Sequence, residues 1–277
     1  MKIAFNETLP QNGLAEDLFL CDKYGYDYIE LRIDRLKAYL DSHGIGELRH
    51  FFATHSIKPL SVNSVVDINF CDPAGWNRML EDFIFSCMMC KELGAPYVVV
   101  VPTRGEAMQE KTREAVFADS VSVLRKLSDI AAVYGAKIAF EPMGNRLYCV
   151  RSIRQGWEIV KAADRENIGL TLDAFNLFTY DGLSDIEDLQ AIPPEKIYVF
   201  HIDDGENRPV SELDPMYHRL LPGDGIVPVR EFVAALRRVG FDHHASLEVF
   251  HPKFYEMDGE TVIREGYEKT KAILEAV

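Results

Sequence analysis

The sequence predicts a single (β/α)8 TIM barrel, a closed ring of parallel strands that alternate with helices. Short apolar runs rich in Val, Ile, Tyr and Phe alternate with longer segments of helical period along all 277 residues. This alternation is typical of βαβ units, and the length is close to that of one α/β barrel. Because no composition shift or long linker interrupts the pattern, we expect one domain over residues 1–277.

The order of the segments supports this fold. Eight runs are expected to be strands: residues 2–6, 28–32, 58–63, 97–103, 137–141, 169–173, 198–202 and 245–250. Helical segments lie between them; Val121, Leu124, Leu127 and Ala131 recur at helical spacing, and Gly135 is expected to end that helix. An open doubly wound sheet is the alternative, but no glycine-rich fingerprint follows the first strand.

The charge of the chain limits its partners. A formal net charge of -14 would repel the phosphates of a nucleic acid and an anionic membrane surface. We therefore expect a small neutral molecule as the partner, while a homo-oligomer remains open. The first residues read as strand and turn without an apolar export segment, and five scattered cysteines form no disulfide framework, so we expect a cytoplasmic location.

Four of the later strands end in the same kind of triplet. Each has a smaller residue, a bulky apolar residue and then a polar one: Ala139-Phe140-Glu141, Thr171-Leu172-Asp173, Val199-Phe200-His201 and Ser246-Leu247-Glu248. Because strand side chains alternate between faces, the bulky residue should face the helices while the other two face inward. The carboxyl ends of barrel strands meet at one mouth, so the four polar side chains should converge there.

These four side chains form a candidate metal site. Carboxylates that crowd together repel one another and lose hydration, and a cation would resolve the conflict. Glu141, Asp173, His201 and Glu248 supply oxygen and nitrogen ligands suited to a divalent ion such as Mn²⁺, Zn²⁺, Mg²⁺ or Co²⁺. The alternative is that each residue only hydrogen-bonds a loop at the end of its strand.

At these residues the sequence resembles a known family. The segments "CDKYGYDYIELR", "IKPLSVNSVV", "NIGLTLDAF", "IYVFHIDD", "PGDGIV" and "SLEVF" are similar to the xylose isomerase-like TIM barrel family, and within it to the inosose (2-keto-myo-inositol) isomerases. The resemblance covers essentially the whole chain. It implies that the four residues bind a single divalent metal, that Glu141 and Glu248 also act as acid and base, and that Arg219 reaches a substrate oxygen.

At two places the sequence differs from the family pattern, and both differences concern the number of metal ions and the type of substrate that we expect. Asn176 stands where many relatives carry a histidine three residues after the aspartate of strand six, so a second metal is not expected there. Endonuclease-type relatives place histidines on strands three and four, where this chain has Asn63 and Thr103. Together with the acidic charge, this argues against cleavage of DNA.

The resemblance implies a metal-dependent isomerase that moves a proton through a metal-bound enediolate of a sugar or polyol ketone, with inosose as the favoured substrate. Glu141 and Glu248 are the candidate catalytic residues. Ketose 3-epimerase, hydroxypyruvate isomerase and inosose dehydratase remain alternatives on the same scaffold, because function lies in the loops and not in the barrel. A non-catalytic sugar-binding barrel is the remoter alternative.

Further residues are candidates for substrate binding. They are polar side chains at the predicted mouth: Asn6, Glu30, Asn63, Asn176 and Arg219. For Asn6, Glu30 and Asn63 a structural role in holding the mouth together is an equal alternative. Asp203 has the same inward parity as His201 and is expected to orient a ligand, while "PGDG" at 222–225 reads as a turn.

Overall fold

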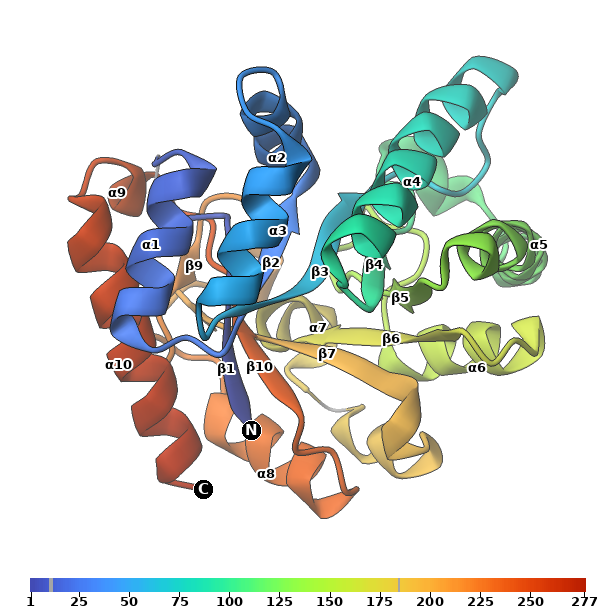
Figure 1. The fold of residues 1–277 in the computed structure, drawn as a ribbon. Helices are drawn as coiled ribbons and strands as arrows, with labels where there is room; N and C mark the ends of the chain where they lie inside the picture. Colours follow the sequence, from blue (N-terminus) through green and yellow to red (C-terminus); the bar gives the residue numbers. More distant parts are fainter. Residues whose placement is uncertain (10–11, 184) are drawn as a thin grey trace.

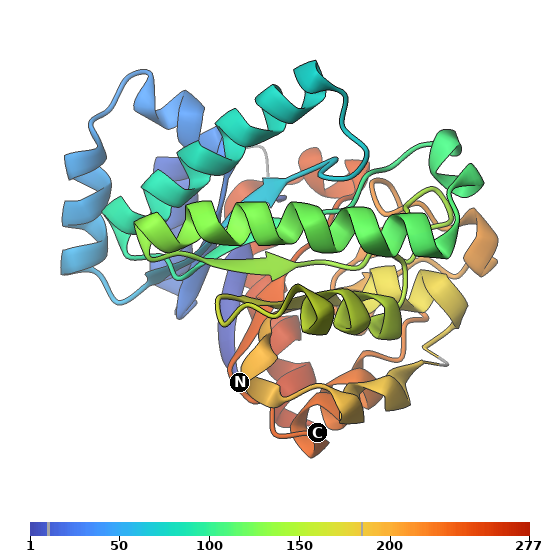
Figure 2. The ribbon, with the colours of Figure 1, turned by 90° about the vertical axis from the view of Figure 1, so that its right-hand side faces the viewer.

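The computed structural model describes residues 1–9, 12–183 and 185–277, and within these ranges eight parallel strands close into a barrel. Helices surround the strands on the outside, and the two chain ends lie on the same side of the ring (Figure 1). A view from another side shows α5 (Arg113–Tyr134) crossing the outside of the barrel (Figure 2). The predicted (β/α)8 fold is confirmed.

The elements follow the predicted alternation. The barrel strands are β1 (Lys2–Asn6), β2 (Tyr28–Arg32), β3 (Lys58–Val65), β4 (Tyr97–Val100), β5 (Lys137–Phe140), β6 (Ile168–Asp173), β7 (Ile197–Ile202) and β10 (His244–Leu247). The other α-helices are α1 (Leu14–Tyr24), α2 (Ile33–Leu40), α3 (Ile45–Thr54), α4 (Pro73–Leu93), α6 (Ile153–Ala163), α7 (Ala174–Asp181), α8 (Val229–Arg238), α9 (Pro252–Tyr255) and α10 (Gly259–Glu275). Short elements complete the chain: the antiparallel pair β8 (Asp204–Gly205) and β9 (Arg219–Leu220), and the 3₁₀ helices η1 (Glu106–Glu110), η2 (Ile186–Ala191), η3 (Pro194–Lys196) and η4 (Val210–Glu212).

The order of strands decides which side chains meet. Around the barrel it runs β1-β10-β7-β6-β5-β4-β3-β2, so the strands with the four polar ends are consecutive neighbours. The register pairs Asp173 with His201 on β6 and β7, and Asn6 with Glu30 on β1 and β2. Polar side chains from distant parts of the sequence are thus brought to one height of the ring.

Three strands end earlier than the sequence indicated. The run 97–103 is a strand only to Val100, and Pro102 has no N–H to donate to a neighbouring strand. Glu141 lies one residue beyond β5 and is followed by another proline. Glu248 lies one residue beyond β10, where the backbone N–H of Val249 donates to Thr8 Oγ1 at 3.1 Å in place of a strand bond.

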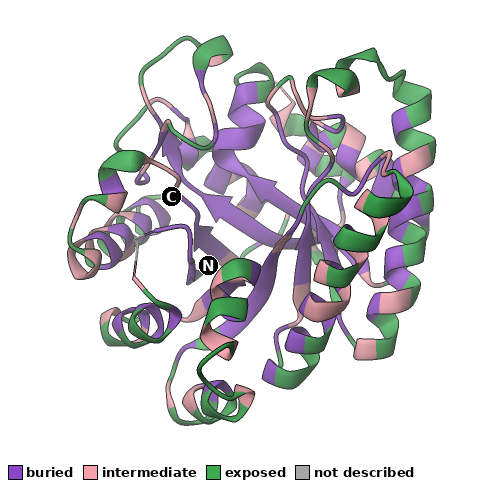
Figure 3. Ribbon diagram, turned by 90° about the horizontal axis from the view of Figure 1, so that it is seen from above, coloured by how far each residue is buried: buried purple, intermediate pink, exposed green. Residues whose placement is uncertain are grey.

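The two faces of the strands have the predicted side chains. Ala4, Ala139 and Val199 belong to a small apolar cluster that fills the barrel. Phe140 and Phe200, which have the opposite parity, belong to the larger core between strands and helices. The barrel strands are mostly buried, apart from first residues such as Lys2, Lys58 and Lys137, and the exposed residues lie on the outer sides of the helices and in the loops (Figure 3). Bulky residues thus pack against the helices and small residues fill the inside of the barrel. The polar residues at the strand ends lie at its mouth.

Among the described residues, none of the helices has both the length and the apolar character that a membrane span requires.

Glu7, directly after β1, is a buried acid outside the predicted site. Its side chain is fully buried, Oε2 accepts the N–H of Arg32 at 2.9 Å, and Oε1 has no hydrogen-bond partner among the described residues. Burial, and then the nearby Asp17 carboxylate, raises the pKa of Glu7 from 4.5 to about 8. The folded protein therefore keeps this proton at a pH where an unfolded chain releases it.

We expect the Glu7 carboxyl to make the free energy of unfolding decrease as the pH rises. Its stabilising effect is complete below the unfolded pKa of 4.5 and is lost as the pH rises through the folded pKa of about 8. Glu7→Gln keeps the shape but cannot ionise, so it should flatten the profile by about 1 kcal/mol or more over this range. Urea unfolding at a series of pH values measures this, and an unchanged slope in the variant would contradict the shifted pKa.

Candidate metal centre

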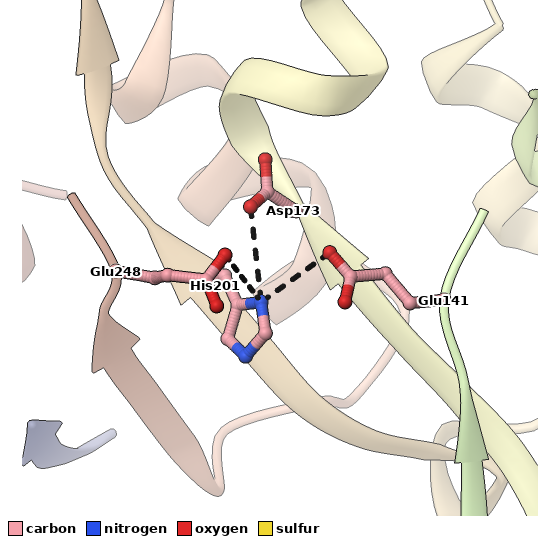
Figure 4. Close-up of side chains that lie close together, drawn as sticks. All are labelled: Glu141, Asp173, His201 and Glu248. Carbon is pink, nitrogen blue, oxygen red and sulfur yellow. Dashed lines mark ion pairs between the residues drawn. The ribbon is translucent and has the colours of Figure 1, made fainter. Parts of the chain in front are cut away.

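Four side chains at the carboxyl ends of β5, β6, β7 and β10 meet at the mouth of the barrel (Figure 4). The distances from His201 Nδ1 are 3.4 Å to Glu248 Oε2, 3.5 Å to Glu141 Oε1 and 3.7 Å to Asp173 Oδ2. All four residues are buried, and one ligand atom from each lies within 4.8 Å of the others. The sequence-predicted set is therefore brought together around one point.

The chemistry of this cluster fits a cation. His201 Nδ1 is buried among the carboxylates and has no hydrogen-bond partner among the described residues. Burial alone would lower the pKa of His201, but Glu248, Glu30 and Glu141 outweigh it and hold the pKa well above its usual value. Burial raises the pKa of Glu248 from 4.5 to about 7, although His201 and Arg219 oppose the shift. The positive charge near the three carboxylates is too small to offset their negative charge, and a divalent ion would supply the rest.

Asp173 has two roles because it ends β6 and caps α7. Its Oδ1 accepts the backbone N–H of Asn176 at 2.6 Å, as an N-cap does. Its other oxygen, Oδ2, is turned toward His201. Although burial would raise the pKa of Asp173, the Arg219 guanidinium and then His201 lower it, so this carboxylate stays ionised. The helix cap thus fixes the orientation of one side chain of the cluster.

Arg219, on β9, is fully buried against the same carboxylates. Its Nη1 lies 2.6 Å from Asp173 Oδ2, 2.7 Å from Asp203 Oδ2 and 2.9 Å from Glu248 Oε2. Burial would lower the pKa of Arg219, but Asp173, Asp203 and Glu248 hold it well above its usual value. The side chain expected to reach a substrate oxygen is thus the permanent cation beside the cluster.

The two aspartates after His201 have separate tasks. Asp203 accepts the N–H of Phe175 through Oδ1 at 2.9 Å and the Arg219 side chain through Oδ2. Asp204 holds the predicted turn: its Oδ2 accepts the N–H of Gly223 at 3.0 Å and of Gly225 at 2.9 Å. A Cβ added at Gly225 would lie 1.9 Å from a backbone oxygen, so this close approach requires glycine. The sequence indicated a turn here but not the aspartate that holds it.

Two asparagines each hold one of the two glutamates. Asn6 Nδ2 donates to Glu248 Oε1 at 2.8 Å, and Asn176 Nδ2 donates to Glu141 Oε1 at 3.1 Å. The Oδ1 atoms of both asparagines are buried and have no hydrogen-bond partner among the described residues. Asn63, the third asparagine predicted at the mouth, has an Nδ2 that lies 3.4 Å from Glu30 Oε2.

A cavity of about 650 Å³ opens beside the ends of β1, β2 and β10. Arg32, Phe250 and Tyr255 are among its lining residues. The centre of the Phe250 ring lies 5.8 Å from the Arg32 guanidinium and 5.3 Å from that of Arg219, so this ring lies between the cavity and Arg219. The volume is sufficient for a small polyol. The sequence analysis did not identify this cavity, because its lining comes from helices α1, α2 and α9 and from loops that are distant in the chain.

The chain is similar to known proteins of one family over most of its length. A family model described as xylose isomerase-like TIM barrel matches residues 18–273. The chain belongs to this family. Among the relatives, the inosose isomerase of Bacillus licheniformis is 40% identical over 277 residues, 99% of this chain and 98% of that protein. The inosose isomerase of Bacillus velezensis is 38% identical, with 99% and 97% covered.

Solved structures extend the comparison. A crystal structure described as the IOLI protein with a binding zinc atom is 39% identical and has a TM-score of 0.94, with 100% of this chain and 99% of that chain covered. A D-psicose 3-epimerase from Clostridium cellulolyticum has a TM-score of 0.74 at 17% identity, which shows a shared fold alone. The zinc in the first structure and the buried cluster here agree with a site for a single metal ion.

We expect added Zn²⁺ to raise the melting temperature of metal-free protein, because an ion that binds only the folded state stabilises it. At one hundred times the dissociation constant the gain is about 2.7 kcal/mol, or roughly 5 °C or more. Asp173→Asn keeps the helix-capping oxygen but removes the negative charge, so most of the increase should disappear. Differential scanning fluorimetry measures both proteins.

The matched control is Asp258→Asn, which alters another capping aspartate, at the start of α10. It should retain the full zinc-induced increase. An equal increase in Asp173→Asn would show that Asp173 does not hold the ion.

Proposed function

We propose that the protein is a metal-dependent isomerase of a polyol ketone, with inosose (2-keto-myo-inositol) as its substrate. The proposal is carried by the buried cluster of one histidine and three carboxylates, whose ligand atoms lie within 4.8 Å of one another. Identities of 37 to 40% over nearly the full length of proteins named inosose isomerase support this substrate. The cavity of about 650 Å³ that Phe250 borders gives room for a ring of that size.

The proposed metal ligands are Glu141, Asp173, His201 and Glu248, and the ion is one of Mn²⁺, Zn²⁺, Mg²⁺ or Co²⁺. When bound, the ion would supply Lewis-acid polarisation of the ketone and the neighbouring hydroxyl. The unpartnered Nδ1 of His201 supports this assignment, since a buried ring nitrogen without a hydrogen bond is costly.

Glu141 and Glu248 are the proposed proton carriers. One carboxylate takes the proton from the carbon that bears the hydroxyl, and a carboxylic acid returns a proton to the former carbonyl carbon. The hydroxyl proton passes to the former carbonyl oxygen, so that the ketone and the hydroxyl exchange positions. The two side chains approach His201 Nδ1 from opposite sides (Figure 4). Transfer on one face gives isomerisation, whereas the use of both faces would permit epimerisation.

Asn6, Asn176, Asn63 and Arg219 are the proposed substrate-binding residues. The Oδ1 atoms of Asn6 and Asn176 are suited to accept hydrogen bonds from substrate hydroxyls, because both are buried and unpartnered among the described residues. The donor groups of the same side chains already hold the glutamates. Each amide would therefore link a substrate hydroxyl to a proton carrier.

We expect Glu248→Gln to lower turnover of inosose by a factor of about 10² to 10⁴, because glutamine cannot take a proton. Because Glu248 is also a proposed metal ligand, the variant is assayed at a zinc concentration that saturates it, and binding of the ketone should then persist. Steady-state kinetics and calorimetry measure the two effects. Glu206→Gln is the control, since Glu206 pairs with His251 and Arg208 outside the cluster. Undiminished turnover in Glu248→Gln would remove the proposed role of Glu248.

We expect 2-keto-myo-inositol to take up deuterium from heavy water at a carbon next to its carbonyl when the metal-loaded protein is present. Proton NMR locates the exchanged position and distinguishes isomerisation from epimerisation. A chelator should stop the exchange, and adding Zn²⁺ or Mn²⁺ back should restore it. The absence of exchange with metal-loaded protein would contradict the proposed function.

A further inference from the structure

Glu30, on β2, contacts His201 on the side of the imidazole opposite the cluster. Glu30 Oε1 lies 3.0 Å from His201 Nε2, while Nδ1 of the same ring faces the carboxylates of Glu141, Asp173 and Glu248. Glu30 and His201 are both fully buried. The two nitrogens of the ring therefore have different surroundings, one with a single hydrogen-bond acceptor and one at the candidate metal position.

Glu30 itself is held rigidly by the neighbouring strand. Ser61 Oγ donates to Glu30 Oε2 at 2.6 Å, and Asn63 Nδ2 lies 3.4 Å from the same oxygen. These bonds anchor one carboxylate oxygen to β3 and turn the other toward His201. A side chain fixed in this way can fix the plane of the imidazole in turn.

Glu30 is also linked to a second proposed ligand. Asn6 Nδ2 lies 3.5 Å from Glu30 Oε1 and donates to Glu248 Oε1 at 2.8 Å. Glu30 is thus hydrogen-bonded to His201 on β7 and is linked through Asn6 to Glu248, directly after β10. Both carboxylate oxygens of Glu30 accept hydrogen bonds from protein donors, whereas the Oδ1 atoms of Asn6 and Asn176 have no partner among the described residues.

We infer that Glu30 is a positioning residue for the metal: it accepts the Nε2–H of His201, fixes that tautomer and leaves the Nδ1 lone pair directed at the ion. A ring that carries its proton on Nε2 has an unprotonated Nδ1, which is the form that binds a metal. An acceptor on the far nitrogen also prevents rotation of the ring. This inference rests on the metal site of the proposed function and replaces the expectation that Glu30 binds substrate.

The test compares metal affinity in Glu30→Gln, Glu30→Ala and wild type by competition with a chromophoric zinc chelator. Both variants should bind Zn²⁺ about tenfold or more weakly, because loss of such a partner typically has this effect. In zinc-loaded wild type, long-range ¹H–¹⁵N spectra should show His201 protonated on Nε2, and this signal should shift or broaden in Glu30→Gln. If Glu30→Ala does not fold, the isosteric Glu30→Gln variant decides.

Glu7→Gln is the matched control, because Glu7 is an equally buried glutamate at the end of the adjacent strand and hydrogen-bonds Arg32 rather than His201. It should bind Zn²⁺ within about twofold of wild type. Unchanged zinc affinity in Glu30→Gln, or an Nε2 without a proton in wild type, would overturn the inference. Failure of wild type to bind zinc would instead contradict the proposed function, so the two failures are distinguishable.

Discussion

Burial of several carboxylates at one point is the constraint on which the mouth of the barrel depends. Asp173, Asp203 and Glu248 all lie within hydrogen-bond distance of Arg219 Nη1, and His201 lies between the remaining acids. Ionised groups without such partners would cost several kcal/mol each on leaving water. The arginine, the histidine and the proposed ion therefore offset the negative charge of the buried carboxylates together. Removal of any one of them leaves more of that negative charge uncompensated.

The secondary structure provides this unit with its orientation. Asp173 can direct one oxygen at the cluster because its other oxygen caps α7. Asn176, three residues later on the same helix, reaches Glu141. The start of one short helix therefore orients two of the cluster's carboxylates, from β6 and from the end of β5. The alternation of side chains along a strand would bring these carboxylates to the mouth, but it would not fix the direction in which their oxygens point.

Much of this arrangement could be predicted from the sequence. The alternation of small, bulky and polar residues before Glu141, Asp173 and His201 indicated which side chains face inward, since a period of two fixes the face of a strand. The sequence also indicated that Glu30 lies at the mouth, but not that the histidine ring lies between it and the carboxylates. That relation depends on the register of β2, β1, β10 and β7 around the closed ring, which the order of residues in one chain does not specify.

Other parts depend on contacts between loops. The position of Arg219 follows from the pairing of β8 with β9, a two-residue ladder too short to recognise in a sequence. The bonds of Asp204 to backbone N–H groups have the same origin, because any of several neighbouring acids could have held the turn. Whether a strand side chain points inward or outward was thus predictable from the local pattern. The hydrogen-bond partner of each inward side chain could be known only once the strands were closed into the barrel.

The turn held by Asp204 has a consequence for how this barrel can diversify. Asp204 Oδ1 and Oδ2 together accept the backbone N–H groups of Gly205, Gly223, Gly225 and Val227, so the base of the hairpin is fastened independently of its tip. Arg219 Nε also donates to the carbonyl of Pro215 at 3.0 Å, so it is the stretch before Pro215 that can change in length or composition while the guanidinium beside the carboxylates keeps its place. Natural variation or engineering could therefore reshape the tip of the hairpin without dismantling the chemistry beneath it.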